Sequence, residues 1–407
     1  MNTPLPPVFS RLAGANLAAQ SAEQISLAAV PIVAVLALGA GPGEIGVLAT
    51  AQTLPFLLLA IPVGLLADRV SKRRLMWLAE ALRALAFLGL LAAAMLDALS
   101  IPLLAVLGFL GAAGTVGFSV AAPALVPALV PWQLLAAANG RLELARSVAF
   151  AAGPALAGAL VAWAGATPAF VLAALLSASA LALLLGLPEP GPVALAPRRH
   201  PLVELREGAA LVWHSALLRP ILLTAVAWNI AWFVLQAAYV PYAVRTLGLS
   251  AGAVGFTLAA YGVGMVLGAL AAPRVLRALP FGQAILLGPV VSVLAATAML
   301  ATLAVPTAAM ATLSFFLFGV GPIIWTISST TLRQTITPAA MLGRVTAIFL
   351  AANMGARPLG AALGGWVGGS FGAQACLWLA LAGFVLQAAL IASSAVRALR
   401  SLPVAAA

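Results

Sequence analysis

The sequence predicts an all-α membrane protein that crosses the bilayer about twelve times. Apolar residues make up 64% of the 407 residues, while only 7% are charged. Soluble domains carry about a quarter charged residues, which they need for solvation. Apolar runs of about 20 residues, enough for a helix to cross ~30 Å of hydrocarbon, recur along the chain. Positive residues gather in alternate loops. The apolar excess must therefore face lipid.

The first six predicted spans fill the first half of the chain. Each is an apolar run bounded by Gly, Pro or charged residues. The first run is too long for the core of a signal peptide and has no cleavable polar end, so we expect it to be retained as a helix. The six spans lie at 11–38, 45–66, 75–96, 101–127, 143–164 and 168–187.

A polar linker over residues 188–216 separates these spans from the rest. Its first part is rich in proline, which predicts a flexible segment. Its second part places Leu205, Ala209, Val212 and Trp213 on one helical face, with charged residues on much of the remainder. This pattern predicts an amphipathic helix at the membrane interface. An enzyme domain does not fit in so few residues.

Six further spans follow the linker. They lie at 217–243, 252–272, 281–303, 307–331, 345–368 and 374–396. The predicted organisation is therefore a first six-helix bundle over 1–187, a linker over 188–216 and a second six-helix bundle over 217–407.

The loops alternate sharply in positive charge. One set of loops and both chain ends carry nearly all of it, whereas the other set has only Arg245. Positive loop residues stay in the cytoplasm, so we expect both termini and the linker to be cytoplasmic. The residues of the positive set are Arg69, Lys72, Arg73, Arg74, Arg141, Arg198, Arg199, Arg206, Arg219, Arg274, Arg277, Arg333, Arg344, Arg397 and Arg400.

The two halves also resemble each other. A Gly-Arg pair precedes or opens the fifth span at Arg141 and the eleventh span at Arg344. A proline among small residues then follows at Pro154 and at Pro358. Because each half holds an even number of spans, the copies keep the same orientation and are related by an axis along the membrane normal. This predicts two six-helix bundles with a site between them.

The loop after the second span reads Gly64-Leu-Leu-Ala-Asp68-Arg69-Val-Ser-Lys72-Arg73-Arg74. This segment resembles the signature of the major facilitator superfamily (MFS). The resemblance implies the MFS fold, with two six-helix bundles around a central cavity. It also implies a conformational latch between the halves, formed by Gly64, Asp68, Arg69 and Arg73. An aspartate is suited to this role, since it accepts hydrogen bonds from the N–H groups of a helix N-terminus.

A second set of motifs is similar to the exporter branch that includes the enterobactin exporter and macrolide efflux proteins. The set comprises 332–345, with its Pro and Gly-Arg, and the small-residue run 358–365. Gly153, Pro154 and Gly158 resemble the antiporter motif of the fifth span, which implies export. Packing alone also explains that motif, because a Gly-Pro pair bends a helix and small residues let helices approach closely. The fourth span has no charged residue, which departs from the drug and proton antiporters.

Ionisable residues within spans are candidates for function, because each costs several kcal/mol there. Glu80 with Arg83, and Glu143 with Arg146, stand three residues apart near the predicted cytoplasmic face. At that spacing each pair neutralises itself on one helix, so we expect both to be structural.

Glu23 is different, because it lies ~18 Å beyond the start of its span, near the midplane. Two hypotheses remain open: Glu23 is a proton or substrate-cation site, or it is a buried structural group. Arg357 is a deep cation on the eleventh span and the second candidate for coupling.

Polar and aromatic side chains on three spans predict the lining of a central cavity. Asn16, Gln20 and Gln24 share a helical face with Glu23 on the first span. The seventh span repeats this pattern with Asn229, Trp232 and Gln236, and Asn353 lies one turn before Arg357. Two such faces would line one cavity.

The sequence lacks the residues that several other functions require. Ser370 stands in a Gly-x-Ser-x-Gly segment, but it follows no strand and has no histidine in reach. Lys72, the only lysine, has no phosphate-binding glycines around it. Cys376 is the only cysteine, and His200 and His214 both lie in the linker region. We therefore expect no enzymatic activity, no cofactor, no metal and no nucleic-acid partner.

These features predict a monomeric secondary transporter of the bacterial inner membrane. We expect it to export a small amphipathic molecule, such as a siderophore or an antibiotic, by alternating access in exchange for protons. The alternatives are a lipid or lysolipid flippase, a metabolite transporter on the same scaffold and a sensor that does not transport. Flux measurements in vesicles separate them.

Overall fold

The computed structural model describes residues 6–67, 70–131, 134–188, 201–338 and 341–403. This part of the chain forms thirteen α-helices and one short 3₁₀-helix, η3 (Ala395–Ala398), and it contains no strand. The helices of the first half are α1 (Pro7–Leu38), α2 (Pro42–Ala67), α3 (Lys72–Met95), α4 (Ile101–Leu129), α5 (Leu135–Ala164) and α6 (Ala166–Leu185). The helices of the second half are α7 (Pro201–His214), α8 (Leu218–Arg245), α9 (Ala251–Ala278), α10 (Phe281–Ala301), α11 (Ala308–Ile336), α12 (Leu342–Phe371) and α13 (Ala373–Ala392).

Twelve of the thirteen helices are long, and α7 is the short one. In the described ranges, eleven helices are both long and apolar enough to cross a membrane. The remaining long helix, α12, has 30 residues and carries Arg344, Arg357 and many glycines, which lower its hydropathy. The prediction of a twelve-helix membrane protein is confirmed. Several helices are longer than predicted; α5, for example, begins at Leu135 instead of residue 143.

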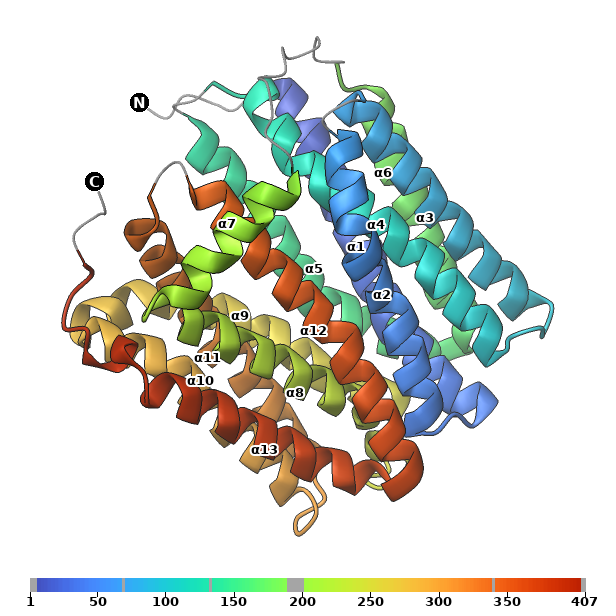
Figure 1. The fold of residues 1–407 in the computed structure, drawn as a ribbon. Coiled ribbons are helices and arrows are strands. Elements are labelled where there is room, and N and C mark those ends of the chain that lie inside the picture. The colour runs from blue at the N-terminus through green and yellow to red at the C-terminus, as the bar shows by residue number, and fades with distance from the viewer. Residues whose placement is uncertain (1–5, 68–69, 132–133, 189–200, 339–340, 404–407) are drawn as a thin grey trace.

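The helices form two bundles that meet in a V (Figure 1). Helices α1–α6 form the first bundle and α8–α13 the second. Two helix pairs form most of the contact between the bundles, α2 with α12 and α5 with α9. The side on which α1, α3, α5, α8, α10 and α12 begin is called the linker side below, because helix α7 lies there (Figure 1).

The bundles touch closely on the side opposite the linker. A Cβ atom added to Gly46, near the start of α2, would lie 2.2 Å from Cα of Gly365 near the end of α12. In the same way, a Cβ on Gly158 of α5 would lie 2.7 Å from Cα of Gly255 of α9. Only glycine permits these approaches. The V is therefore closed on this side, whereas the bundles diverge toward the linker side (Figure 1).

Helix α7 lies in the segment for which the sequence predicts an amphipathic helix, and it packs on α12. Glu207 forms an ion pair with Arg344. Of the predicted apolar face, Val212 is buried, while Ala209 and Trp213 are exposed. Leu205 has no described side chain.

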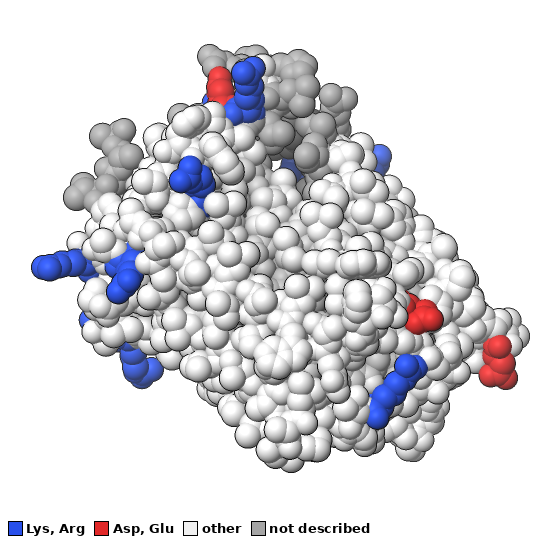
Figure 2. All heavy atoms as spheres, turned by 60° about the horizontal axis from the view of Figure 1, so that its bottom comes forward, with Lys and Arg blue, Asp and Glu red and all other residues white. Residues whose placement is uncertain are grey.

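The outer surface agrees with a membrane environment. Figure 2 shows a broad face with almost no charged side chains, with the charges at its margins. Large apolar side chains are exposed on the long helices, among them Leu85, Leu270 and Trp366. Lipid would cover such residues.

Candidate functional site

A cavity of about 380 Å³ lies between the two bundles. Helices α1–α5 line it from the first half, and α8, α9, α11 and α12 from the second. Its charged lining residues are Glu23, Arg83, Arg146 and Arg357. The cavity therefore lies where the internal repeat predicts a site, and charged side chains reach it from both halves.

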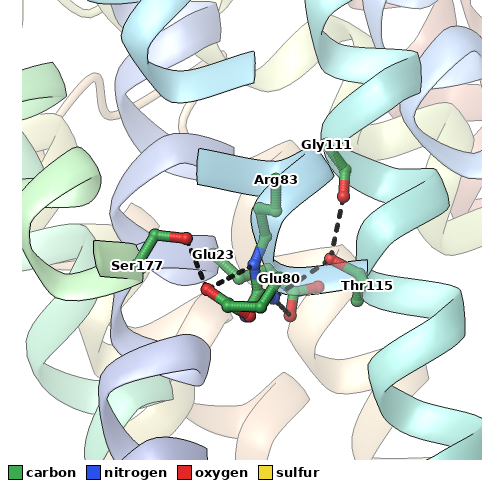
Figure 3. A network of polar contacts seen from close by, with 6 residues as sticks. All are labelled: Glu23, Glu80, Arg83, Gly111, Thr115 and Ser177. Carbon is green, nitrogen blue, oxygen red and sulfur yellow. Dashed lines mark hydrogen bonds and ion pairs between the residues drawn. The ribbon is translucent and has the colours of Figure 1, made fainter. Parts of the chain in front are cut away.

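A buried polar cluster of the first bundle is centred on Arg83 of α3 (Figure 3). Its Nε donates to Glu80 at 3.3 Å, and a second nitrogen also bonds this carboxylate. Its Nη1 donates to the hydroxyl of Thr115 at 3.3 Å. Ser177 of α6 donates to Glu80. Glu80 is 0% exposed and Arg83 is 1% exposed, so this predicted pair is a buried network that joins three helices.

Glu23 of α1 completes the cluster from the cavity side. Its carboxylate lies 3.8 Å from Nη1 of Arg83, and its side chain is 18% exposed. We define Glu23, Arg83 and Glu80 as the N-side triad. With all three ionised, the triad has two negative charges and one positive charge. The sequence placed Glu80 and Arg83 near the cytoplasmic face, but the contact with Glu23 places them at the depth of the cavity.

The second bundle contributes an aromatic wall. Trp228 and Trp232 of α8 stack with ring centroids 5.4 Å apart. Tyr261 of α9 lies 5.0 Å from Trp232, and Phe318 of α11 packs edge-on at 5.1 Å. Such a wall suits a flat or ring-bearing ligand.

Three predicted lining residues of α8 do line the cavity: Asn229, Trp232 and Gln236. The amide nitrogen of Asn229 donates to Ala225 O at 2.9 Å and to Asn353 Oδ1 at 3.4 Å. Asn353 lines a second cavity, of about 410 Å³, within the second bundle. Asn229 therefore connects the two cavities.

Arg357 of α12 borders both cavities. Its guanidinium lies 5.9 Å from the ring of Phe56 in the first half and 5.9 Å from that of Phe233 in the second. Among the described residues, no carboxylate lies within ion-pair distance of Arg357, and its Nε is buried without an acceptor. Aromatic faces from both halves thus hold this cation at their junction.

Other predicted residues have packing contacts instead of a place on the cavity wall. Asn16 donates to Leu142 O at 3.3 Å, and neither Asn16 nor Gln20 lines either cavity. A Cβ on Gly153 would meet Gln24 at 2.5 Å, so this glycine brings α5 against α1. Gly158 brings α5 against α9, as described above, and Pro154 lines the central cavity between them.

The predicted latch is only partly described. Asp68 and Arg69 lie outside the described residues, and Gly64 belongs to α2 without a described environment. Arg73 donates to Leu185 O at 2.7 Å, and Arg11 donates to Gly186 O at 2.6 Å. These two cations bind the carbonyl groups at the end of α6, where a helix favours positive charge.

One contact between the halves was not predicted. Arg245, at the end of α8, donates to the carbonyl oxygens of Gly39 and Ala40 at the end of α1. The sequence marked Arg245 only as an exception to the charge pattern. The contact could have been predicted from that exception, because a single cation on the sparsely charged side is expected to have a hydrogen-bond partner.

The comparisons with known proteins agree with this geometry. A family model described as Major Facilitator Superfamily matches residues 12–361. The chain is 31% identical over 306 residues to an enterobactin exporter, EntS, of Escherichia coli O1:K1 / APEC; the match covers 75% of this chain and 72% of that protein. Among solved structures, the nucleoside transporter NupG has a TM-score of 0.77 at 13% identity and covers 95% of this chain and 99% of its own. A bacterial homolog of the human lysosomal transporter Spinster, in an inward-facing and unoccupied conformation, has a TM-score of 0.75 at 16% identity, with 95% and 97% covered.

Proposed function

This chain belongs to the major facilitator superfamily, and we propose that it exports a small, partly apolar molecule across the bacterial inner membrane by alternating access. One observation carries the proposal: the central cavity lies between two bundles whose close glycine contacts, in the described part of the chain, lie on the side opposite the linker. The similarity to an enterobactin exporter supports the direction of transport.

The conformation is inward-facing if the linker side is cytoplasmic. The charge asymmetry supports that orientation, because positive loop residues stay in the cytoplasm. On the opposite side, the contacts of Gly46 with Gly365 and of Gly158 with Gly255 close the path to the cell exterior. Alternating access requires these contacts to separate while the linker-side ends approach each other.

Proton coupling would use the N-side triad. One proton would bring the net charge of the triad from −1 to zero, and charge in the membrane is costly. Glu80 is held by Arg83 and Ser177 within the protein, whereas Glu23 reaches the cavity. Glu23 is thus the member that exchanges a proton with the cavity, and Arg83 holds the other members in place.

Transport into proteoliposomes tests this function. Vesicles with an acidic interior mimic the cell exterior, so protein with its linker side outward should concentrate substrate inside them. A thermal-shift screen first shows which candidate molecules bind. The siderophore enterobactin and the macrolide erythromycin are the first probes in that screen. Movement of a labelled lipid without a soluble substrate would instead indicate a flippase, and binding without flux would indicate a sensor.

The Glu23→Gln variant tests the coupling role, because it resembles a permanently protonated group. It should lose accumulation driven by the pH gradient but keep exchange of substrate down its own gradient. Glu44→Gln is the matched control: Glu44 is exposed on the opposite side, where it accepts a hydrogen bond from Gly41 N at 2.8 Å. If Glu23→Gln concentrates substrate as the wild type does, Glu23 is a structural polar residue.

A further inference from the structure

The second cavity lies inside the C-terminal bundle, and its charged lining residues are all positive. It is lined by residues of α8–α13 and by Arg146 of α5. Two of its lining residues, Arg333 and Arg357, are cations of the C-terminal bundle itself. Arg333 lies near the linker-side end of α11, and Arg357 lies deep in α12. The cavity therefore has a positive group near its cytoplasmic end and another at its junction with the central cavity.

No acid of the C-terminal bundle can neutralise these arginines. All nine acidic residues of the chain lie between Glu23 and Glu207, so the whole sequence from 208 to 407 has none. On the N-terminal side, Glu23 and Glu80 interact with Arg83, while Glu143 bonds Arg146 at 2.5 Å and 2.9 Å. In the described part of the chain, Arg333 and Arg357 have no carboxylate partner.

The two guanidinium groups have aromatic contacts instead. Arg333 lies 4.7 Å from the ring of Phe349, and Arg357 contacts two rings as described above. The Nε atoms of both arginines are buried without an acceptor, and so is the indole nitrogen of Trp325 in the same cavity. A cation–π contact offsets only part of the cost of removing a charge from water. Three donors in one cavity thus lack an acceptor from the protein.

From these observations we propose that the second cavity binds the negatively charged group of the transported molecule, which is an organic oxyanion attached to an aromatic or otherwise apolar body. This inference rests on the proposed function and specifies its substrate class. Guanidinium groups suit carboxylate and related oxyanions, because their N–H groups match two oxygen atoms. Trp325 would supply one further donor.

The apolar body would extend into the central cavity. Arg146, Trp228, Asn229, Tyr261 and Arg357 line both cavities, so the two spaces adjoin. Each has a volume typical of the sites that hold drug-sized ligands. With its charged group at Arg357, a ligand would place a ring against the wall formed by Trp228 and Trp232. Arg333 would attract the anion first, because it lies nearer the cytoplasmic end.

Binding of matched acids and amides to the purified full-length chain tests the proposal. Isothermal titration would compare benzoate, 2-naphthoate and anthracene-2-carboxylate with their uncharged carboxamides. We expect at least one acid to bind about tenfold or more tightly than its amide, as charge-assisted hydrogen bonds imply. If no acid binds more tightly than its amide, the proposal is wrong.

Variants assign the selectivity to the two arginines. Arg357→Gln and Arg333→Gln should each weaken binding of the acid about tenfold and leave binding of the amide unchanged. Arg357→Lys, which keeps the charge, should retain part of the selectivity. The control is Arg277→Gln, because Arg277 is an exposed arginine of the same bundle whose Nε donates to Pro273 O at 3.1 Å. Equal acid affinity in Arg357→Gln, Arg333→Gln and the wild type would overturn the assignment.

The outcome of this binding experiment is independent of the outcome of the transport experiment. Titration needs neither turnover nor a pH gradient, and size-exclusion profiles with melting curves show whether each variant is folded. If the protein binds acids more tightly than amides but transports nothing, the anion site is supported and export is refuted. If the protein transports substrate but binds acids and amides with equal affinity, export is supported and the anion site is refuted.

Discussion

Replacing Gly46 with alanine should open the contact between the bundles on the side opposite the linker. The new Cβ would lie 2.2 Å from Cα of Gly365, 2.7 Å from its backbone nitrogen and 3.0 Å from Ala361 O. Carbon atoms pack at about 3.5–4.0 Å, so the nearest contact must lengthen by roughly 1.3–1.8 Å. All three neighbours are backbone atoms, and no side chain can rotate away. Helices α2 and α12 must therefore separate.

The expected shift follows from the cost of this overlap. Overpacking costs about 1–3 kcal/mol, and the outward-facing state relieves it, because the two helices part there. The ratio of outward-facing to inward-facing molecules should rise about 5- to 150-fold. Gly43→Ala is the matched control on the same helix: its Cβ would lie 3.7 Å from both Gly365 O and Gly369 Cα, which is an ordinary contact.

Distances between two spin labels measure the shift. Leu96 and Val305 are exposed positions of the two halves on the side opposite the linker. Cysteines can be introduced there after Cys376, the only native cysteine, is replaced by serine. Gly46→Ala should increase the population with long distances and lower the flux, whereas Gly43→Ala should do neither. If both variants give the wild-type distance distribution, the glycine contact does not control closure.

Two further predictions concern stability and orientation. Arg83→Leu leaves Glu80 buried without its cation, which should destabilise the protein by about 3–5 kcal/mol and lower both yield and melting temperature; Glu23→Gln, which keeps Arg83 and Glu80, should melt near the wild type. A reporter fused after Ala407 should lie in the cytoplasm, and one fused near Gly248 should lie outside the cell. A periplasmic C-terminus would contradict both the inward-facing conformation and the proposed export of substrate.

The sequence by itself determined the membrane class, the long helices and the helix in the linker. These features are local, since about 20 apolar residues suffice for a span and the alternating charge of the loops indicates the orientation of the spans. The i,i+3 pairs, Glu80 with Arg83 and Glu143 with Arg146, were likewise predictable, because one helix places both members of each pair. The motif resemblance supplied the family in the same way, from short contiguous segments.

Only the tertiary structure decided which polar residues meet. Asn16, Gln20, Glu23 and Gln24 were predicted to share a helical face. Only Glu23 and Gln24 reach the cavity, because α5 covers the linker-side part of α1. Arg83 approaches Glu23 from a different helix, and Arg245 reaches carbonyl groups more than 200 positions earlier in the chain. The rotation and tilt of each helix set such contacts, and both depend on packing against neighbouring helices. Hydropathy carries no information about that packing, so the helices were predictable and their mutual contacts were not.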